Sequence, residues 1–184
     1  MKDASGLVDD QTLMLARQGD RKARDRLIRS LQDPLYRFCL HLLNGNENDA
    51  VDAVQETALR LLKHLSGFDG RSSLRTWAFG IAVNVAREMR RKRKPAGSIE
   101  EIDVAGPDND HGDSLDKQAT LDRVKTLLEG LGERQREALL LRFFEEQSVE
   151  QTAETMKCSQ GTVKATVFQA LRVLRGKLGV KSDE

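Results

Sequence analysis

The feature that most constrains the fold is a C-terminal segment, residues 148–177, in which two helix starts are separated by a short break. Ser148 is a favourable N-cap, and Gln151 three residues later completes a capping box, so a short helix should begin there. The helical spacing of apolar residues is interrupted at Lys157, and Ser159 offers a second N-cap. The segment therefore predicts a helix-turn-helix whose second helix is long.

The long second helix has two chemically distinct sides. Apolar residues at helical spacing predict a buried side; these are Val163, Val167, Ala170, Leu171, Leu174 and Leu178. The opposite side carries Gln160, Lys164, Phe168, Arg172 and Arg175. Residues 157–181 contain six Lys or Arg and no Asp or Glu. Cations for phosphates and polar side chains for base edges suit a reader of the DNA major groove. The alternative is an ordinary helical hairpin with a solvated basic side.

Composition and charge extend this view to the whole chain. Charged residues make up 32% and aromatic residues 4% of the 184 residues, and the apolar positions follow helical spacing, which favours an all-α protein. The net charge is only +1, but residues 87–94 carry six basic residues and residues 96–116 carry seven acidic ones. We therefore predict two small helical domains, 1–95 and 117–184, joined by a flexible acidic linker over 96–116.

The linker contains Pro, Gly and acidic residues without a sustained apolar period, so it cannot fix the distance between the two domains. Its cluster of Asp108, Asp110, His111 and Asp113 suggests a metal site, but Gly112 falls where a calcium loop needs a ligand. No closing Glu follows either. A solvated acidic tether is the better interpretation, and we expect neither a metal nor a cofactor.

Several classes of protein are disfavoured. Cys39 and Cys158 lie in separate helical regions, and neither a disulfide framework nor a zinc site is indicated. No signal peptide is visible, and no apolar stretch approaches the ~20 residues that span a bilayer, so we expect a cytoplasmic protein without membrane insertion. The sequence has no Gly-rich phosphate loop, nucleophile elbow or metal triad, so we do not expect an enzyme.

The N-terminal half predicts a series of helices. A short helix should end at Gly19, Asp20 should cap the next one, and Asp33-Pro34 predicts a stop followed by a restart. Further helices are expected over 49–65, with Val51, Val54, Ala58, Leu61, Leu62 and Leu65 inward, and over 74–94, capped by Ser73.

The predicted helix 74–94 has a core face that consists of Leu74, Trp77, Ala78, Ile81, Ala82, Val85 and Met89. At the edge of this face, Trp77, Asn84 and Arg91 recur every seven residues and lead into the basic run. An aromatic ring that stacks on a base beside cations that follow the backbone would suit single-stranded DNA. The alternative is that Trp77 is simply a core residue.

These blocks, taken in order, resemble extracytoplasmic-function (ECF) sigma factors. The resemblance rests on DAVDAVQETALRLLKHL, on GFDGRSSLRTWAFGIAVNVAREMRRKRK and, after the linker, on LGERQREALLLRFFEEQSVEQTAETMKCSQGTVKATVFQALRVLRGKL. It covers about residues 10–179. It implies two helical domains that bind the core of bacterial RNA polymerase, at the β′ clamp and the β flap, and recognise two promoter elements. An anti-sigma factor is a further candidate partner.

The resemblance also implies site residues. The patch for the β′ clamp would be Asp52, Gln55 and Glu56. The surface for the minus-ten element would comprise the base-capturing loop Phe68, Asp69, Gly70, Arg71 and Ser72 together with Arg75, Trp77, Asn84, Arg87 and Arg91. The surface for the minus-thirty-five element would comprise Gln160, Thr162, Lys164, Ala165, Phe168, Gln169 and Arg172.

Two further expectations follow. Lys157 stands where the family often has Gly in the turn, so a left-handed backbone there would cost about 1–2 kcal/mol. The alternative function is a stand-alone helix-turn-helix regulator whose N-terminal half senses a ligand or dimerises. A sensor needs a pocket or a dimer seam, whereas the N-terminal half instead shows a basic aromatic helix and an acidic patch.

Overall fold

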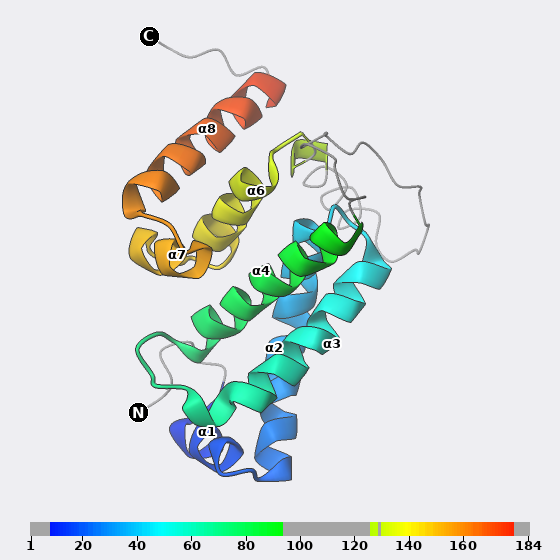
Figure 1. Cartoon of the computed structure of the whole chain (residues 1–184), viewed down its shortest axis with the longest axis vertical. Coiled ribbons are helices and arrows are strands. Elements are labelled where there is room, and N and C mark those ends of the chain that lie inside the picture. Colours follow the sequence, from blue (N-terminus) through cyan, green and yellow to red (C-terminus); the bar gives the residue numbers. More distant parts are fainter. Residues whose placement is uncertain (1–7, 94–125, 129, 179–184) are drawn as a thin grey trace.

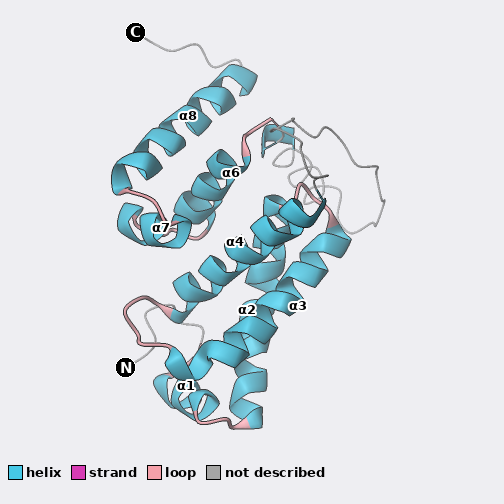
Figure 2. Ribbon diagram, in the orientation of Figure 1, coloured by secondary structure: helices cyan, strands magenta, loops and turns pink. Residues whose placement is uncertain are grey.

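The computed structural model describes residues 8–93, 126–128 and 130–178, and within these ranges the regular elements are helices (Figure 1; Figure 2). The all-α prediction is confirmed. The elements are α1 (Asp10–Arg17), α2 (Arg21–Leu42), α3 (Glu47–His64), the 3₁₀ turn η1 (Leu65–Gly67), α4 (Leu74–Arg93), α6 (Glu133–Leu139), the π-helical turn η2 (Leu140–Phe144), α7 (Val149–Met156) and α8 (Gln160–Leu178). The predicted acidic linker, with its candidate metal cluster, lies outside the described residues.

Side-chain caps set the helix starts in the N-terminal half. The Asp20 carboxylate accepts a hydrogen bond from the Ala23 amide at 2.7 Å, and the Ser73 hydroxyl accepts one from the Thr76 amide at 3.0 Å. Both predicted caps are confirmed. Helix α3 begins two residues earlier than predicted, because Asn46 caps it by accepting from the Asp49 amide at 3.0 Å.

The predicted break at Asp33-Pro34 is wrong, since α2 continues through Pro34 to Leu42. Proline inside a helix removes one backbone hydrogen bond and costs about 3 kcal/mol. Leu31, Leu35 and Leu42 stay in phase across the proline and are all buried. Each such leucine contributes about 1.5–3 kcal/mol when buried, so continuity of the apolar face outweighs the proline.

Helices α2, α3 and α4 pack against one another, and α1 packs against α2 (Figure 1). The buried side of α3 runs through Ala50, Ala53, Thr57 and Leu61. Val51 was predicted to be inward but is 43% exposed, because it lies one position away from that side.

In the C-terminal half the predicted capping box is confirmed. Ser148 Oγ accepts from the Gln151 amide at 3.1 Å, and Gln151 Oε1 accepts from the Ser148 amide at 2.8 Å. Lys157 adopts the left-handed conformation, with φ 54° and ψ 53°. Ser159 then caps α8 by accepting from the Thr162 amide at 3.0 Å. Helices α7 and α8 therefore form the predicted helix-turn-helix.

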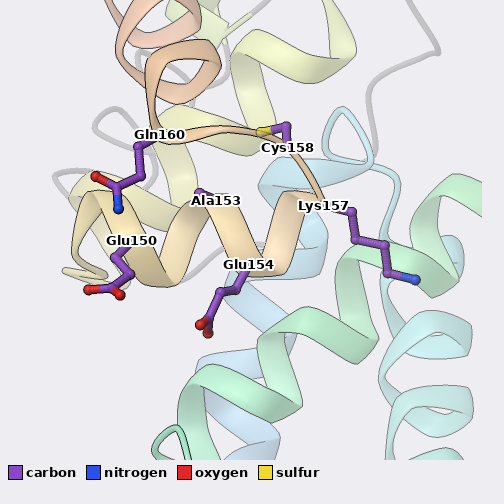
Figure 3. A pocket seen from close by; sticks show the side chains of 6 residues that line it. All are labelled: Glu150, Ala153, Glu154, Lys157, Cys158 and Gln160. Atoms are coloured by element: carbon purple, nitrogen blue, oxygen red, sulfur yellow. The ribbon is translucent and has the colours of Figure 1, made fainter.

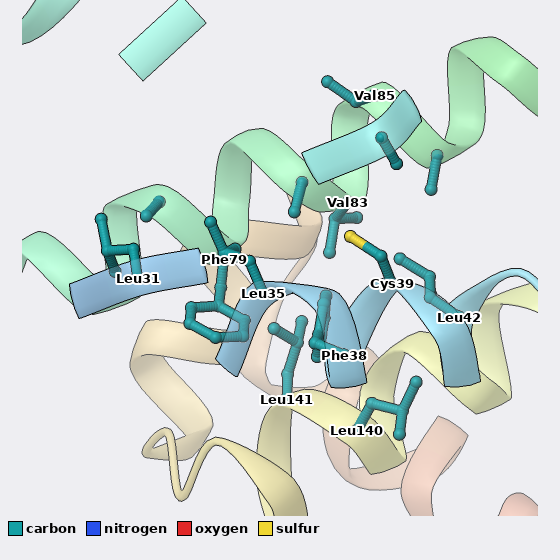
Figure 4. Packing of buried hydrophobic residues seen from close by; sticks show 14 of the residues in the cluster. Leu31, Leu35, Phe38, Cys39, Leu42, Phe79, Val83, Val85, Leu140 and Leu141 are labelled. Atoms are coloured by element: carbon teal, nitrogen blue, oxygen red, sulfur yellow. The ribbon is translucent and has the colours of Figure 1, made fainter. Parts of the chain in front are cut away.

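The two halves share one cluster of buried apolar residues. The Phe38 and Phe79 rings meet edge to face with centroids 4.8 Å apart, and Leu140 and Leu141 of η2 are fully buried beside them (Figure 4). We expected the distance between the halves to be left unfixed by the linker. In the structure it is fixed by direct packing of η2, α6 and α7 on α2 and α4.

Candidate nucleic-acid interface

Helix α4 is buried along two sides rather than one. Leu74, Ala78, Ala82 and Val85 occupy the predicted core face and are buried. Phe79, Val83 and Ala86 are buried as well, on a side that the sequence analysis did not assign to the core. On this second side Phe79 meets Phe38 of α2, and α4 also packs on α7. The signal that could have predicted it is that apolar residues occur nearly all round the first half of the helix.

The loop before α4 is organised around an aromatic contact. Phe68 is only 7% exposed, and its ring centroid lies 5.1 Å from that of Trp77. Asp69 accepts from the Arg71 amide at 3.1 Å, and this hydrogen bond is the largest cause that lowers the pKa of Asp69. Gly70 has φ +74°, a conformation that favours glycine. The Arg71 side chain remains 89% exposed.

The basic residues of α4 are divided between ion pairs and solvent. Arg75 donates to Glu145 at 2.8 Å and lies over the Phe79 ring, 5.0 Å from its centroid. On another side of the helix, Asn84 is half-buried and Arg91 is exposed. The structure therefore separates the predicted minus-ten residues into a paired set and an accessible set.

Glu137 of α6 forms ion pairs with two arginines in the second half of α4. Arg87 donates to both of its carboxylate oxygens, at 3.0 and 2.6 Å, and Arg90 donates at 2.8 Å. The Glu137 side chain is 1% exposed. A buried carboxylate must be paired to be tolerated, so these contacts are structural as well as electrostatic.

Sequence reasoning missed the role of Glu137, although a signal was present. Glu137 lies three and four residues before Leu140 and Leu141, both fully buried, so it belongs to the same stripe of the helix. A carboxylate in phase with a buried stripe needs a cation from another element. The sequence alone does not say which arginine supplies it.

Glu145 is the second carboxylate that reaches α4. Its side chain is 6% exposed, and its carboxylate lies 2.7 Å from the Arg75 guanidinium. Burial raises the pKa of Glu145 from 4.5 to about 7, and Arg75 opposes that rise. Burial therefore makes the ionised form of Glu145 costly, and the ion pair with Arg75 offsets part of that cost.

The acidic residues of α3 are not equivalent. Asp52 and Gln55 are exposed. Glu56 accepts from Arg60 Nε at 2.6 Å, and the same guanidinium donates to both oxygens of Glu88 at 2.8 and 2.7 Å. The hydrogen bonds to Glu88, followed by the one to Glu56, raise the pKa of Arg60, and the bonds from Arg60 lower the pKa of Glu88. In the candidate patch, Asp52 and Gln55 are therefore accessible, whereas Glu56 is held by an ion pair with Arg60.

On α8 the predicted recognition residues share one accessible side. Lys164, Phe168 and Arg172 follow one another at four-residue steps, and Phe168 is 66% exposed. The other predicted residues are exposed too; these are Gln160, Thr162, Ala165 and Gln169. Of the side predicted to be buried, Val163 and Ala170 are buried, Val167, Leu171 and Leu174 are half-buried, and Leu178 is 50% exposed.

An open hollow lies between α7 and the start of α8 (Figure 3). It is lined by Glu150, Ala153, Glu154, Lys157, Cys158 and Gln160. The Glu150, Glu154 and Lys157 side chains project outward into solvent, so the hollow does not enclose a ligand. Within the described ranges, His, Cys, Asp and Glu form no group able to hold a metal ion. The same ranges contain no helix with the length and apolarity that a bilayer span requires.

Both halves of the chain match models of known protein families. Residues 27–95 match the family model for Sigma-70 region 2, and residues 121–174 match the model for Sigma-70, region 4. The chain is 29% identical to the ECF RNA polymerase sigma-E factor of Haemophilus influenzae, over 95% of this chain and 97% of that one. It is 30% identical to the ECF RNA polymerase sigma factor SigX of Bacillus subtilis, over 82% of this chain and 80% of that one.

Solved structures agree with this assignment. The sigma factor RpoE of Bartonella quintana, determined in complex with the anti-sigma factor NepR, aligns with a TM-score of 0.62 at 26% identity. The alignment covers 93% of this chain and 96% of that one. CnrH, determined in complex with the cytosolic domain of CnrY, has a TM-score of 0.69 at 22% identity over 94% of this chain and 97% of that one. The likeness to CnrH supports the fold.

Proposed function

This chain belongs to the ECF sigma factors, a non-enzymatic family that directs promoter-specific transcription initiation by RNA polymerase, and on that premise we propose how its surfaces divide the task. Residues 1–95 would bind core polymerase and the minus-ten element, and residues 117–184 would bind the minus-thirty-five element. Residues 96–116 would connect these two halves. The observation that carries the function is that both region models match in order along one chain, with relatives aligned over nearly its whole length.

The polymerase-binding surface is assigned to α3. Asp52, Gln55, Glu56 and Leu59 lie at i, i+3, i+4 and i+7, so they share one side of the helix. Leu59 is 65% exposed beside these polar residues. An apolar residue beside acidic and amide groups suits a basic helical partner such as the β′ clamp coiled coil. The β flap would be engaged by the C-terminal half.

The minus-ten surface is assigned to the loop over residues 68–72 and to α4. Extracting one base from the stack costs a few kcal/mol, which a preformed loop can offset by stacking and edge hydrogen bonds. The Phe68–Trp77 contact supports preformation, because it orders the loop before DNA arrives. Asn84 and Arg91 extend this surface along α4, and Arg75 and Arg87 would add phosphate contacts.

The minus-thirty-five surface is assigned to the exposed side of α8. Lys164 and Arg172 supply cations for phosphates, and Gln160 and Gln169 supply groups able to read base edges. This surface needs no rearrangement, since its residues are already accessible. An anti-sigma factor remains a candidate partner, supported by the RpoE relative that was solved with NepR. The site of action would be the cytoplasm.

The test is reconstitution of transcription with purified core polymerase and a template library randomised upstream of the start. We expect transcripts from one class of start site, preceded by two selected elements. Gln160→Ala with Gln169→Ala should relax the sequence selected at the upstream element, and Trp77→Ala should relax the sequence selected at the downstream one. A chain that does not comigrate with core polymerase, or that gives start sites independent of both elements, would contradict the proposal.

A further inference from the structure

We propose that Glu88 of α4 is a positioning residue for the polymerase-binding patch on α3. It holds both Nη atoms of Arg60, so that Arg60 reaches Glu56 through Nε alone and the second carboxylate oxygen of Glu56 stays available to a cation of the partner. The inference rests on the proposed role of Asp52, Gln55 and Glu56 in binding core polymerase. It adds to that patch a residue from the neighbouring helix.

The three charged side chains form one network of hydrogen bonds across α3 and α4. Arg60 Nη1 and Nη2 donate to the two oxygens of Glu88 at 2.8 and 2.7 Å, which is the bidentate contact that suits a guanidinium and a carboxylate. Arg60 Nε donates to Glu56 Oε1 at 2.6 Å. Arg60 is therefore bound more completely by the residue on the neighbouring helix than by the residue one turn before it in α3.

Without Glu88, Arg60 would be free to close on Glu56. Residues four positions apart on a helix are neighbours, and an arginine can bind a carboxylate with two donors, here Nε and one Nη. That contact would engage both oxygens of Glu56 and neutralise its charge. The hydrogen bonds to Glu88 prevent it by occupying both Nη atoms. In agreement, these bonds are the largest cause that raises the pKa of Arg60, ahead of the bond to Glu56.

The network lies at the surface, where a partner can reach it. The side chains of Glu56, Arg60 and Glu88 are 44%, 33% and 36% exposed. Glu56 shares one side of α3 with Asp52 and Gln55, which are also exposed. A lysine or arginine of a basic partner helix therefore meets Glu56 without having to displace Arg60.

The network contributes more to the orientation of Glu56 than to the packing of the helices. Helices α3 and α4 lie side by side, and both supply fully buried apolar residues to the same cluster, among them Leu61 and Ala82 (Figure 1). Ion pairs between partly exposed side chains add little to the stability of a fold. Removing the network should therefore alter the patch on α3 while leaving the fold intact.

Titration of the full chain, labelled at its N-terminus, with core polymerase tests the proposal. Glu88→Gln keeps the shape of the side chain but removes the charge that holds Arg60. Arg60 should then close on Glu56, and the affinity for core polymerase should fall roughly three- to fivefold. Asp25→Asn removes the same charge from an exposed pair with Arg29 on α2 and should bind like the parent. Equal losses in the two variants would contradict the proposal, because they would show a general effect of net charge.

A charge-conserving variant separates geometry from charge. Arg60→Lys keeps the positive charge, but one ammonium group cannot donate to Glu88 from two nitrogens and to Glu56 from a third. Its affinity for core polymerase should fall by a similar factor, whereas Arg29→Lys, in the exposed pair on α2, should leave the affinity unchanged. Parent-like binding by Arg60→Lys would contradict the proposal.

A double-mutant cycle shows whether Glu88 acts through Glu56. In a Glu56→Gln background the carboxylate that Glu88 keeps accessible is gone, so Glu88→Gln should change the affinity by less than about 1.5-fold. A role limited to the stability of the fold would give the same loss in both backgrounds, and that result would overturn the inference. Urea denaturation of each variant should show midpoints close to that of the parent.

The same titrations separate this inference from the proposed function. If Glu56→Gln weakens binding and Glu88→Gln does not, Glu88 has no positioning role while the polymerase-binding patch on α3 stands. If Glu56→Gln binds core polymerase as the parent does, the assigned patch is wrong, and the inference fails with it. Weakening by each single variant, without a further loss in the double variant, is the result that the inference predicts.

Discussion

Arg87 donates two hydrogen bonds to Glu137, a residue fifty positions further along the chain and in the other half of the fold. The contact joins a basic residue of the proposed minus-ten helix to a carboxylate that is 1% exposed. It buries part of the proposed DNA-binding face of α4 against the other half of the chain. The free energy of unfolding should therefore depend on this ion pair.

Truncating Glu137 should weaken the fold. Glu137→Ala leaves Arg87 and Arg90 without their carboxylate, and the loss of these charged hydrogen bonds should lower the free energy of unfolding by about 1–3 kcal/mol. Urea denaturation followed by circular dichroism measures this. Glu154→Ala, on the exposed side of α7, should change the midpoint little. An unchanged midpoint for Glu137→Ala would show that the contact carries no stability.

The contribution of Glu145 to the stability of the fold should decrease as the pH rises. The pKa of Glu145 is raised from 4.5 to about 7 by burial, against the influence of Arg75 and with a further rise from Glu146. A raised pKa means that this contribution is fully present below pH 4.5 and is lost as the pH rises through about 7. The difference in free energy of unfolding between the parent chain and Glu145→Gln, measured by urea denaturation at constant ionic strength, should therefore change over this interval.

A second titrating group lies where the two halves pack together and acts in the opposite direction. His41 packs on Phe144, with ring centroids 5.2 Å apart, and burial lowers its pKa below 6.5. Its protonation at low pH should therefore destabilise the fold. Glu145→Gln should remove the loss of stability near pH 7 and leave the loss at low pH, whereas Glu146→Gln should keep both. A pH profile of stability unchanged by Glu145→Gln would exclude Glu145 as the cause.

Replacing Lys157 with glycine should stabilise the helix-turn-helix. Its backbone has φ 54°, a conformation that costs a non-glycine residue about 1–2 kcal/mol. Lys157→Gly should relieve part of that cost and raise the midpoint of urea denaturation, whereas Lys157→Ala should not. A lower midpoint for the glycine variant would mean that the lysine side chain itself contributes more than the strain removes.

Lys164 should contribute to promoter binding without reading sequence. It is exposed on the proposed recognition side of α8, and one phosphate contact changes the slope of log affinity against log salt by about one. In the polymerase complex, Lys164→Ala should weaken binding across all promoters and reduce this slope by about one. Gln169→Ala should instead alter the preference at particular bases. An unchanged slope in Lys164→Ala would show that the lysine does not contact a DNA phosphate.

The local structure was predictable, but the arrangement of the halves was not. Caps at Asp20, Ser73 and Ser148 depend on side chains within a few residues, which sequence patterns record directly. Pro34 was misjudged because its cost is local, whereas the gain from Leu31 and Leu35 is tertiary.

The packing between the two halves could not be derived from the sequence for the same reason. Phe79 and Val83 form a second apolar side of α4, but such a side does not specify which element covers it. The pairing of Arg87 with Glu137 depends on how two segments meet across a long intervening stretch. The candidate site residues could be named from the family resemblance, while the division into covered and accessible sets required the structure.

The most direct test of the arrangement of the two halves is single-molecule energy transfer between dyes at Lys22→Cys on α2 and Arg175→Cys on α8, both exposed, in a Cys158→Ser background. Because the halves pack directly on each other, the free chain should show one predominant distance. A broad distribution of distances in the free chain would contradict this arrangement.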